Sequence, residues 1–331
     1  MSLQKWTLKT TVEHRGLRLD DVLVGWLPRV LKQPVSKGKV RKLVIAGAVY
    51  LNGRRVRIAS KLIQENVSIQ VYLDLKKLNS DQKSQDRAFE MTQDHVRFED
   101  DHLIGVDKPS GIPTQATLDE SRDHLFAAVK RFLAQRDGLP LPQVYLGLHH
   151  RLDRDTSGLI LMTKSKEANP GVAELFTSHA IVKVYQALVA SRRVAPQAEW
   201  TVKNYLGRPP GSGKKVKWRS VHSGGDFAHT DFRLLEDLGS AYWVEARPKT
   251  GRTHQIRVHL SEDQMSILGD PTYSNESAAG GHLIQVPRLM LHAVSLTFIH
   301  PIYQTKISLQ SDLPEDLKKC LQVLRKKGRD C

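Results

Sequence analysis

The chain is poor in cysteine, in aromatic residues and in acidic residues, and it contains no long hydrophobic run. Its two cysteines among 331 residues both lie near the C-terminus, so no disulfide framework is expected to hold the fold. No apolar stretch reaches the length needed to cross a membrane, and no apolar signal core follows the first few charges. These absences predict a cytoplasmic globular protein with no membrane partner.

The shortage of acidic residues leaves a strong positive charge. The chain holds 50 Lys and Arg against 35 Asp and Glu, a formal net charge of +15. An excess of this size points to a polyanionic partner, most often nucleic acid. Residues 1–75 hold 14 basic and 5 acidic side chains, a net charge of +9. More than half of the excess therefore lies in less than a quarter of the chain, which favours a basic binding module over uniform solubilising charge.

Composition also divides the chain into domains. Residues 76–92 are polar and nearly devoid of apolar side chains, and we interpret them as a linker. The linker separates a small domain, 16–75, from a large domain, 93–315, and residues 316–331 are interpreted as a basic C-terminal tail. In the large domain, strands and helices alternate without regular βαβ spacing, which predicts an α+β fold around a mixed sheet.

The small domain is expected to begin with two helices and to end with short strands. Apolar residues recur at helical spacing from Leu17 to Leu27 and stop at Pro28, and a second helix is predicted over Lys39–Ala46. A strand over Val49–Leu51 is followed by Asn52-Gly53, a strong hairpin signal.

The most informative segment is Gly147–Gly158, which places Asp153 beside Arg151 in a short polar turn. Strand-like apolar runs, Val144–Leu148 and Leu159–Met162, flank the turn. A carboxylate held in such a turn can be ionised, oriented and partly shielded from water, as a nucleophile or a base requires. An ordinary salt-bridged turn is the alternative interpretation.

Three further segments carry candidate site residues. Tyr185 lies on a predicted strand, and Leu291 lies on another. Arg257 is placed on a helix over His254–Leu260, which Thr253 could cap. As isolated residues, the tyrosine and the leucine are better explained as core side chains.

The sequence motifs that suggest a metal site or a phosphate-binding loop are incomplete. The calcium-loop pattern that begins at Asp153 has Lys164 at its twelfth position, where a bidentate glutamate is needed. His254 and His259 are five residues apart, so on a helix they do not converge, and paired cysteines for zinc are lacking. The Pro-, Gly- and Lys-rich insert 206–217 could touch RNA or be solvated decoration, and the sequence leaves that choice open.

Taken in order, the motifs resemble the RluA-type pseudouridine synthases over residues 93–302. The matching segments are Val106–Gly111, His150-Arg151-Leu152-Asp153, Tyr185, Gly251–Leu260, Gly269-Asp270-x-x-Tyr273 and Leu291-His292-Ala293. The resemblance implies a mixed, largely antiparallel central sheet with flanking helices. It also implies isomerisation of a uridine in RNA, a reaction that requires no cofactor and no metal.

The resemblance also implies roles for single residues. Asp153 matches the catalytic aspartate, which attacks the sugar or the uracil ring or abstracts a sugar proton. Arg257 matches its basic partner, and Tyr185 the active-site tyrosine. Arg151 matches the residue that helps to hold the flipped base out of the RNA, and Leu291 an apolar wall of the pocket.

Several alternatives remain at this level. The target is expected to be a uridine in a structured RNA, with large-subunit ribosomal RNA favoured over tRNA. A non-catalytic RNA-binding or ribosome-assembly protein on the same fold is a second hypothesis. A hydrolase that releases free base is a third, although no second acidic motif accompanies Asp153. We expect a monomer.

The small domain carries a second resemblance, to the RNA-binding module named after protein four of the small ribosomal subunit. The matching residues are Arg18-Leu19-Asp20, Lys39–Leu43, Gly47, Val49–Gly53 and the closing strand near Val67–Val71. The resemblance implies that five basic side chains face phosphates: Arg41, Lys42, Arg54, Arg55 and Arg57. The segment Leu31–Lys39 departs from the usual Ser-Arg start of the second helix, and an unrelated basic helix–hairpin domain is the alternative.

Overall fold

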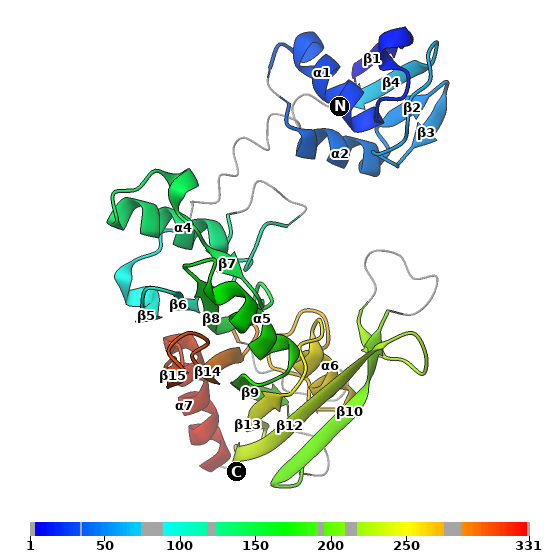
Figure 1. Cartoon of the computed structure of the whole chain (residues 1–331). Helices are drawn as coiled ribbons and strands as arrows, with labels where there is room; N and C mark the ends of the chain where they lie inside the picture. The colour runs from blue at the N-terminus through cyan, green and yellow to red at the C-terminus, as the bar shows by residue number, and fades with distance from the viewer. Residues whose placement is uncertain are drawn as a thin grey trace. The chain divides into compact units, whose positions relative to one another are not determined.

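A computed structural model describes residues 4–33, 35–73, 89–117, 123–190, 195–208, 217–274 and 286–329. Residues 4–73 belong to one compact unit, and residues 89–115 and 124–329 belong to a second (Figure 1). Most of the expected linker 76–92 and of the insert 206–217 lies outside the described residues. Within the described ranges, no helix is long and apolar enough to span a bilayer.

The first unit packs two helices against a four-stranded antiparallel sheet with the order β1-β4-β2-β3. Its elements are β1 (Gln4–Lys9), α1 (Leu19–Leu31), α2 (Lys37–Ala46), β2 (Val49–Leu51), β3 (Arg54–Val56) and β4 (Ser68–Leu73), with a 3-10 turn at Val12–His14. Leu23 and Leu27 of α1 and Val40 and Val44 of α2 are fully buried in its core. The four-residue spacing within each pair places it on one helical face.

Two expectations for this unit were wrong. The first helix does not end at Pro28, because α1 continues to Leu31 and reaches a left-handed residue at Lys32. Proline removes one hydrogen bond of the helix, and burial of Leu23 and Leu27 on the same helix offsets that loss. In addition, the unit begins before residue 16, since β1 pairs along its whole length with β4.

The second unit is built on an eleven-stranded sheet. The main path runs β11-β10-β12-β13-β9-β14-β8-β6-β5, with β15 paired to β14 and β7 paired to β8. The pair β14–β8 is parallel, and the other pairs in the sheet are antiparallel. With its flanking helices, the sheet confirms the predicted α+β class with a mixed, largely antiparallel sheet.

The strands are β5 (Val96–Glu99), β6 (Leu103–Lys108), β7 (Gly147–Leu148), β8 (Ser157–Thr163), β9 (Val182–Ala190), β10 (Glu199–Gly207), β11 (Arg219–Ser220), β12 (Asp226–Asp237), β13 (Ala241–Pro248), β14 (Leu291–Ile299) and β15 (Lys306–Gln310). The helices are α4 (Leu125–Arg136), α5 (Ala168–Thr177), α6 (Gln255–Glu262) and α7 (Glu315–Arg329), with 3-10 turns at Gln93–His95 and Leu141–Gln143. The strand expected over Val144–Leu148 is shorter than predicted, because only Gly147 and Leu148 pair with β8.

Strand β14 joins the two halves of the sheet. It lies between β9 and β8, although these two strands precede it by about a hundred residues of chain. Gly158 of β8 adopts a φ of +113°, and a Cβ atom there would lie 2.3 Å from the carbonyl oxygen of Ala293. Only glycine allows this close approach of β8 to β14, so the glycine that ends the polar turn also fixes the central strand pair.

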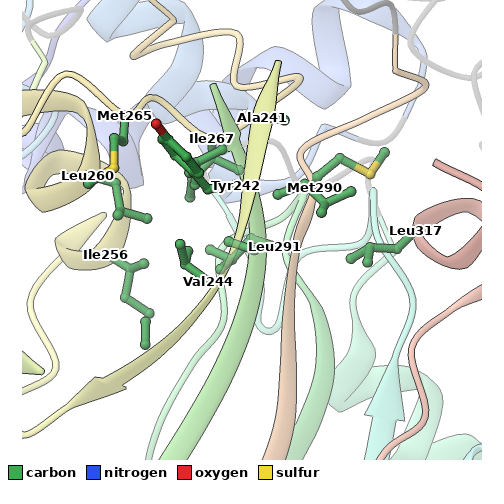
Figure 2. Close-up of a cluster of buried hydrophobic side chains, with 14 of the residues drawn as sticks. Ala241, Tyr242, Val244, Ile256, Leu260, Met265, Ile267, Met290, Leu291 and Leu317 are labelled. Carbon is green, nitrogen blue, oxygen red and sulfur yellow. The ribbon is translucent and has the colours of Figure 1, made fainter. Parts of the chain in front are cut away.

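Helix α6 rests on the inner face of β13 through its apolar side chains. Figure 2 shows Ile256 and Leu260 of α6 beside Tyr242 and Val244 of β13 and near Leu291 of β14. Ile256 and Leu260 are four residues apart and so project from one face of the helix. This packing determines where the polar residues at the start of α6 lie.

The C-terminal segment is not the basic tail that the sequence suggested. Residues Glu315–Arg329 form α7, and Leu317, Leu321 and Leu324 are buried in the same core as β13 and β14. Figure 2 shows Leu317 in this core. Arg288 donates two hydrogen bonds to Asp316, at 2.6 and 2.8 Å. Lys319 and Lys326 of this helix are exposed, and Arg325 is paired with Glu236 at 2.6 Å, so the net charge of the segment suggested a tail.

Candidate active site

The second unit contains a cavity of about 460 Å³ next to the central strands. The loop between β7 and β8, residues 149–156, contributes one wall, and the start of α6 contributes another. Strand β9 and the first residue of β14 complete the enclosure. The lining residues used below are His150, Arg151, Asp153, Lys183, Tyr185, Thr250, Arg252, His254, Arg257 and Leu291.

Asp153 and Arg257 meet in this cavity as predicted from the sequence. Nη1 of Arg257 donates a 2.9 Å hydrogen bond to Oδ2 of Asp153. The Asp153 side chain is 18% exposed and the Arg257 side chain 7% exposed. A carboxylate in this position is reachable from the cavity while its charge is balanced by a buried guanidinium.

The guanidinium is itself held by a second carboxylate. Nε and Nη2 of Arg257 each donate a 2.8 Å bond to Asp270, whose side chain is fully buried. Burial acts to raise the pKa of Asp270, but the hydrogen bonds and charge of Arg257 prevail, so the pKa lies below its usual value. Burial acts to lower the pKa of Arg257, and Asp270 and Asp153 raise it above its usual value. The bidentate pair leaves one guanidinium nitrogen directed at Asp153.

A tight turn fixes Asp270. Its Oδ1 also accepts hydrogen bonds from the backbone N–H groups of Thr272 at 2.8 Å and Tyr273 at 3.1 Å. The preceding residue, Gly269, has a φ of +73°, and a Cβ atom there would lie 2.0 Å from the carbonyl oxygen of Arg288. The Gly269-Asp270 pair is therefore a structural requirement for the orientation of Arg257.

The helix start that carries Arg257 differs from the prediction. Thr253 does not cap α6; His254 occupies the N-cap position in a left-handed conformation, with φ +57°, and makes no side-chain cap. Instead, the side chain of Gln255 organises the turn. Its Oε1 accepts from Thr250 Oγ1 at 2.7 Å and from the Arg252 N–H at 3.0 Å.

His254 is a site residue that sequence reasoning missed. Its Nε2 lies 3.8 Å from Oδ2 of Asp153, and its Nδ1 lies 2.9 Å from the hydroxyl of Tyr273. Burial, reinforced by the charge of Arg257 and opposed by that of Asp153, lowers the pKa of His254. The left-handed backbone conformation of His254 brings its side chain beside Asp153. Nothing in the Thr253-His254 sequence indicates that conformation. His259, by contrast, points to Thr230 and Asn204.

The backbone of the β7–β8 loop is held by the segment that follows β6. The Lys108 side chain is fully buried, and its Nζ donates to the carbonyls of Pro109 at 3.0 Å, Ile112 at 2.9 Å and Arg154 at 2.9 Å. Thr114 Oγ1 donates to the Leu152 carbonyl at 2.8 Å. These bonds attach to the residues on either side of Asp153 and so fix the position of its carboxylate.

Replacement of Lys108 with methionine is expected to loosen this loop. The carbonyls of Pro109 and Ile112 lose this donor, and the carbonyl of Arg154 keeps only the N–H of Gly111, at 2.9 Å. Leaving a buried carbonyl unsatisfied costs about 1–3 kcal/mol, so the free energy of unfolding and the rate of the reaction at Asp153 should both fall. Urea denaturation and single-turnover assays measure the two effects. The matched control is Lys164→Met, a half-buried lysine paired with Glu99 that does not line the cavity. Equal rates in the two variants would contradict the role of Lys108.

Lys108 also gives the stability a defined pH dependence. Burial lowers its pKa from 10.5 to about 7, against the attraction of Asp155 and Asp153. Between these values the unfolded chain binds more protons than the folded chain, so this group makes folding more favourable as the pH rises from about 7 to 10.5. The Lys108→Met variant should lack this increase in urea denaturation at stepped pH.

The other predicted cavity residues lie where the sequence placed them. Tyr185 is half-buried on β9, opposite Ala246 of β13 and Ala293 of β14. Burial, and then the charge of Asp153, raise the pKa of Tyr185, so its hydroxyl keeps its proton at neutral pH. Leu291 forms part of an apolar wall, and Arg151 is exposed where it lines the cavity.

Two further lining residues were overlooked as candidates. Burial lowers the pKa of Lys183 to about 8, and its Nζ donates to the Thr250 carbonyl at 3.3 Å, so its ammonium group favours an anionic ligand. Burial, then the charge of Lys183, lowers the pKa of His150 to about 3. The neutral imidazole accepts from the Leu161 N–H at 2.8 Å and stacks on Phe176. Across the described residues, no cluster of three or more potential metal ligands occurs.

The basic residues predicted in the first unit differ in how they are engaged. Arg54 and Arg57 are exposed. Arg55 donates to the hydroxyl of Tyr50 at 2.5 and 2.9 Å. Arg41 is half-exposed and donates a 2.7 Å bond to Asp20, which is fully buried. The side chain of Lys42 lies outside the described part of the structure.

Comparisons with known proteins agree on one family. A family model described as RNA pseudouridylate synthase matches residues 102–262. Ribosomal large subunit pseudouridine synthase D of Zymomonas mobilis is 31% identical over 329 residues, covering 97% of this chain and 98% of the relative. Ribosomal large subunit pseudouridine synthase C of Vibrio cholerae is 31% identical over 316 residues, covering 94% of each chain.

A solved structure agrees as well. Human RNA pseudouridylate synthase domain containing 4 is 25% identical, with a TM-score of 0.56, and the match covers 76% of this chain and 98% of that one. Together with the mixed sheet, these matches define an RNA-modifying isomerase. The chain belongs to the RluA-type RNA pseudouridine synthase family and is an RNA pseudouridine synthase.

Proposed function

We propose that this enzyme converts a uridine of large-subunit ribosomal RNA to pseudouridine in the cavity described above, with Asp153 as the catalytic group. The observation that carries the assignment is the carboxylate of Asp153, which lines the cavity and accepts a hydrogen bond from the buried Arg257. The names of the relatives from Zymomonas and Vibrio support the choice of ribosomal RNA. A tRNA target is the alternative outcome of the test below.

The reaction breaks the bond between the sugar C1′ and N1 of uracil and forms a bond from C1′ to C5. The proton displaced from C5 replaces the bond lost at N1, so no external group is consumed. A negatively charged carboxylate is needed whether Asp153 attacks the sugar, adds to the ring or takes a sugar proton. The guanidinium of Arg257 is fixed in advance by Asp270, so it stabilises that charge without rearrangement.

The remaining cavity residues fit a uracil removed from its RNA stack. Extrusion of a base costs a few kcal/mol, and the ring of Tyr185 with the side chain of Leu291 can recover part of it by apolar contact. The protonated hydroxyl of Tyr185 serves as a hydrogen-bond donor. Arg151, exposed beside the cavity, can stack on neighbouring bases or bind phosphate.

We also propose that the first unit is the RNA-binding module that its resemblance implies. Arg54 and Arg57 are its best phosphate ligands, because their side chains are exposed, whereas Arg41 is engaged by the buried Asp20. Alignment with the Zymomonas relative over 97% of this chain includes the first unit, which supports a shared arrangement. The full enzyme is expected to act in the cytoplasm as a monomer. Gel filtration with light scattering tests the oligomeric state.

The salt dependence of RNA binding tests this module. The double variant Arg54→Ala, Arg57→Ala is expected to flatten the plot of log affinity against log salt by about 0.7–0.9 per lost phosphate contact. Filter binding at four salt concentrations gives the slope. The control is Arg136→Ala, an arginine bound by Glu99 and Asp137 in the second unit. An unchanged slope in the double variant would remove both arginines from the interface.

The target is tested by mapping pseudouridines in cells with and without this enzyme. Loss of a site in large-subunit ribosomal RNA, restored by the wild-type chain and not by Asp153→Asn, is the expected result. Loss of a tRNA site instead would reassign the substrate. If every site in both RNAs persists, the proposed function is wrong.

A further inference from the structure

Strands β10 and β12 form a long antiparallel pair (Figure 1), and two exposed aromatic rings lie side by side on it. Tyr205 of β10 is paired directly with Phe227 of β12. Their side chains are 53% and 43% exposed, and the ring centroids lie 5.7 Å apart in an edge-to-face arrangement. His229, on the same face of β12, lies 6.5 Å from Phe227. The hairpin therefore presents a small aromatic surface to solvent.

Basic side chains border this aromatic pair. Lys203 is exposed two residues before Tyr205, and Arg219 is exposed on β11, which pairs with the end of β10. An acid on this face, Asp231, is engaged by Thr201, His229 and Lys249. Aromatic rings next to cationic groups favour a nucleic-acid ligand over an apolar protein surface.

The aromatic pair is connected to the active-site cavity through the backbone. Arg252 lines the cavity, and its Nε donates a 3.0 Å hydrogen bond to the carbonyl of Phe227. Thr250 also lines the cavity, and its hydroxyl accepts from the N–H of His229 at 3.0 Å. Residues 250–252 therefore form the cavity wall on one side and adjoin the aromatic strand on the other.

We propose that Tyr205 and Phe227 form a stacking platform for a nucleotide that flanks the target uridine. The proposal rests on the assignment of the cavity to uridine isomerisation. When one base is extruded, its neighbours lose a stacking partner, and an aromatic ring on the strand that adjoins residues 250–252 of the cavity wall replaces that partner. Stacking tolerates any base because every base has a π-face, so the platform contributes affinity for unpaired RNA.

The test is the affinity of the full enzyme for unmodified, in vitro transcribed large-subunit ribosomal RNA. The double variant Tyr205→Ala, Phe227→Ala is expected to bind on the order of tenfold more weakly, as loss of a stacked base implies. Its salt slope should match that of the wild type, because no phosphate contact is lost. Lys203→Ala is the charge control, in which a lower affinity comes with a flatter salt slope.

Two further variants separate stacking from folding. The exchanged pair Tyr205→Phe, Phe227→Tyr keeps both rings and should keep wild-type affinity. Tyr303→Ala removes a tyrosine that is 48% exposed on the β14–β15 turn, outside the cavity lining, and should leave RNA binding unchanged. In the wild-type enzyme, RNA that contains 4-thiouridine should cross-link under ultraviolet light to Tyr205 or Phe227, as peptide mass spectrometry can show.

The outcomes distinguish this proposal from the assignment of the substrate. Wild-type affinity in the Tyr205→Ala, Phe227→Ala variant, or no cross-link at either ring, would overturn the platform. The wild-type enzyme would still convert uridine in this RNA, so the assignment of the substrate would be unaffected. Weaker binding with an unchanged salt slope, but no uridine converted in this RNA by the wild type, would support the platform and reject the proposed target.

Discussion

Asp153→Asn is expected to lower the rate of pseudouridine formation by about 10³-fold or more, since removal of a catalytic proton-transfer group alone typically costs 10²–10⁴. The amide has nearly the shape of the carboxylate and still accepts a hydrogen bond from Arg257, so the fold should persist. RNA affinity should be equal or higher, because one negative charge leaves a cavity that receives a polyanion. Single-turnover conversion and filter binding give the two values.

A neighbouring aspartate provides the matched control. Asp155 lies two residues later in the same loop and is paired with Arg154 at 2.9 Å, and it does not line the cavity. Asp155→Asn should therefore convert uridine at close to the wild-type rate. If Asp153→Asn still forms pseudouridine, Asp153 is not the catalytic group. Release of free uracil by the wild type would indicate a hydrolase.

Arg257→Met is expected to impair stability and catalysis together. The change leaves Asp270 as a buried charge without its partner, and breaking a buried pair in this way costs about 3–5 kcal/mol. Asp153 loses the group that orients it, so conversion should fall as well. Adding Asp270→Asn to this variant should recover part of the unfolding free energy, because the uncompensated charge is gone, but should not recover activity. Urea denaturation and single-turnover assays separate the two.

The matched control for this variant is Arg288→Met. Arg288 also makes a two-bond contact with a carboxylate, that of Asp316, and does not line the cavity. Its loss should cost stability with little effect on the rate of conversion by folded enzyme. If Arg257→Met were as stable and as active as the wild type, the Asp270–Arg257–Asp153 chain would have no role.

The Asp270–Arg257–Asp153 contacts also predict that the free energy of unfolding falls in acid. The pKa of Asp270 is lower in the folded protein than its usual value, so the unfolded chain takes up a proton first as the pH falls. The stabilisation that ionised Asp270 gives the folded protein is fully present above the usual carboxyl pKa. It is lost as the pH falls toward the lower pKa that Asp270 has in the folded state. Urea denaturation between pH 6 and pH 3 should show a smaller decline in the Arg257→Met, Asp270→Asn variant.

Where one motif held a residue and its context, the sequence predicted which residues meet in the cavity. Asp153 lies between two pairing strands, and Arg257 shares a helix with apolar neighbours that determine which way it faces. Asp270 and Lys108 were within recognised motifs, yet their roles depend on contacts between distant parts of the chain. Lys108, for example, reaches the carbonyl of Arg154, a partner that no local pattern specifies.

The wrong predictions at α6, α7 and α1 have related physical causes. The left-handed residue at His254 is imposed by the hydrogen bonds of Gln255 with Thr250 and Arg252, which overrides the capping preference of Thr253. Net charge concealed the apolar face of α7, because one leucine every three or four residues suffices to bury a helix. The expected end of α1 at Pro28 failed since a proline near the last turn costs a single hydrogen bond.

The position of β14 has a consequence for biosynthesis. This strand separates β9 from β8 and supplies Leu291 to the cavity, so the earlier strands cannot close the sheet by themselves. While residues 291–299 of a nascent chain have not yet left the ribosome, the two halves of the sheet lack the strand β14 that joins them. A chain that stops before β14 would therefore carry Asp153, Arg257 and Asp270 without the strand that joins the two halves of the sheet.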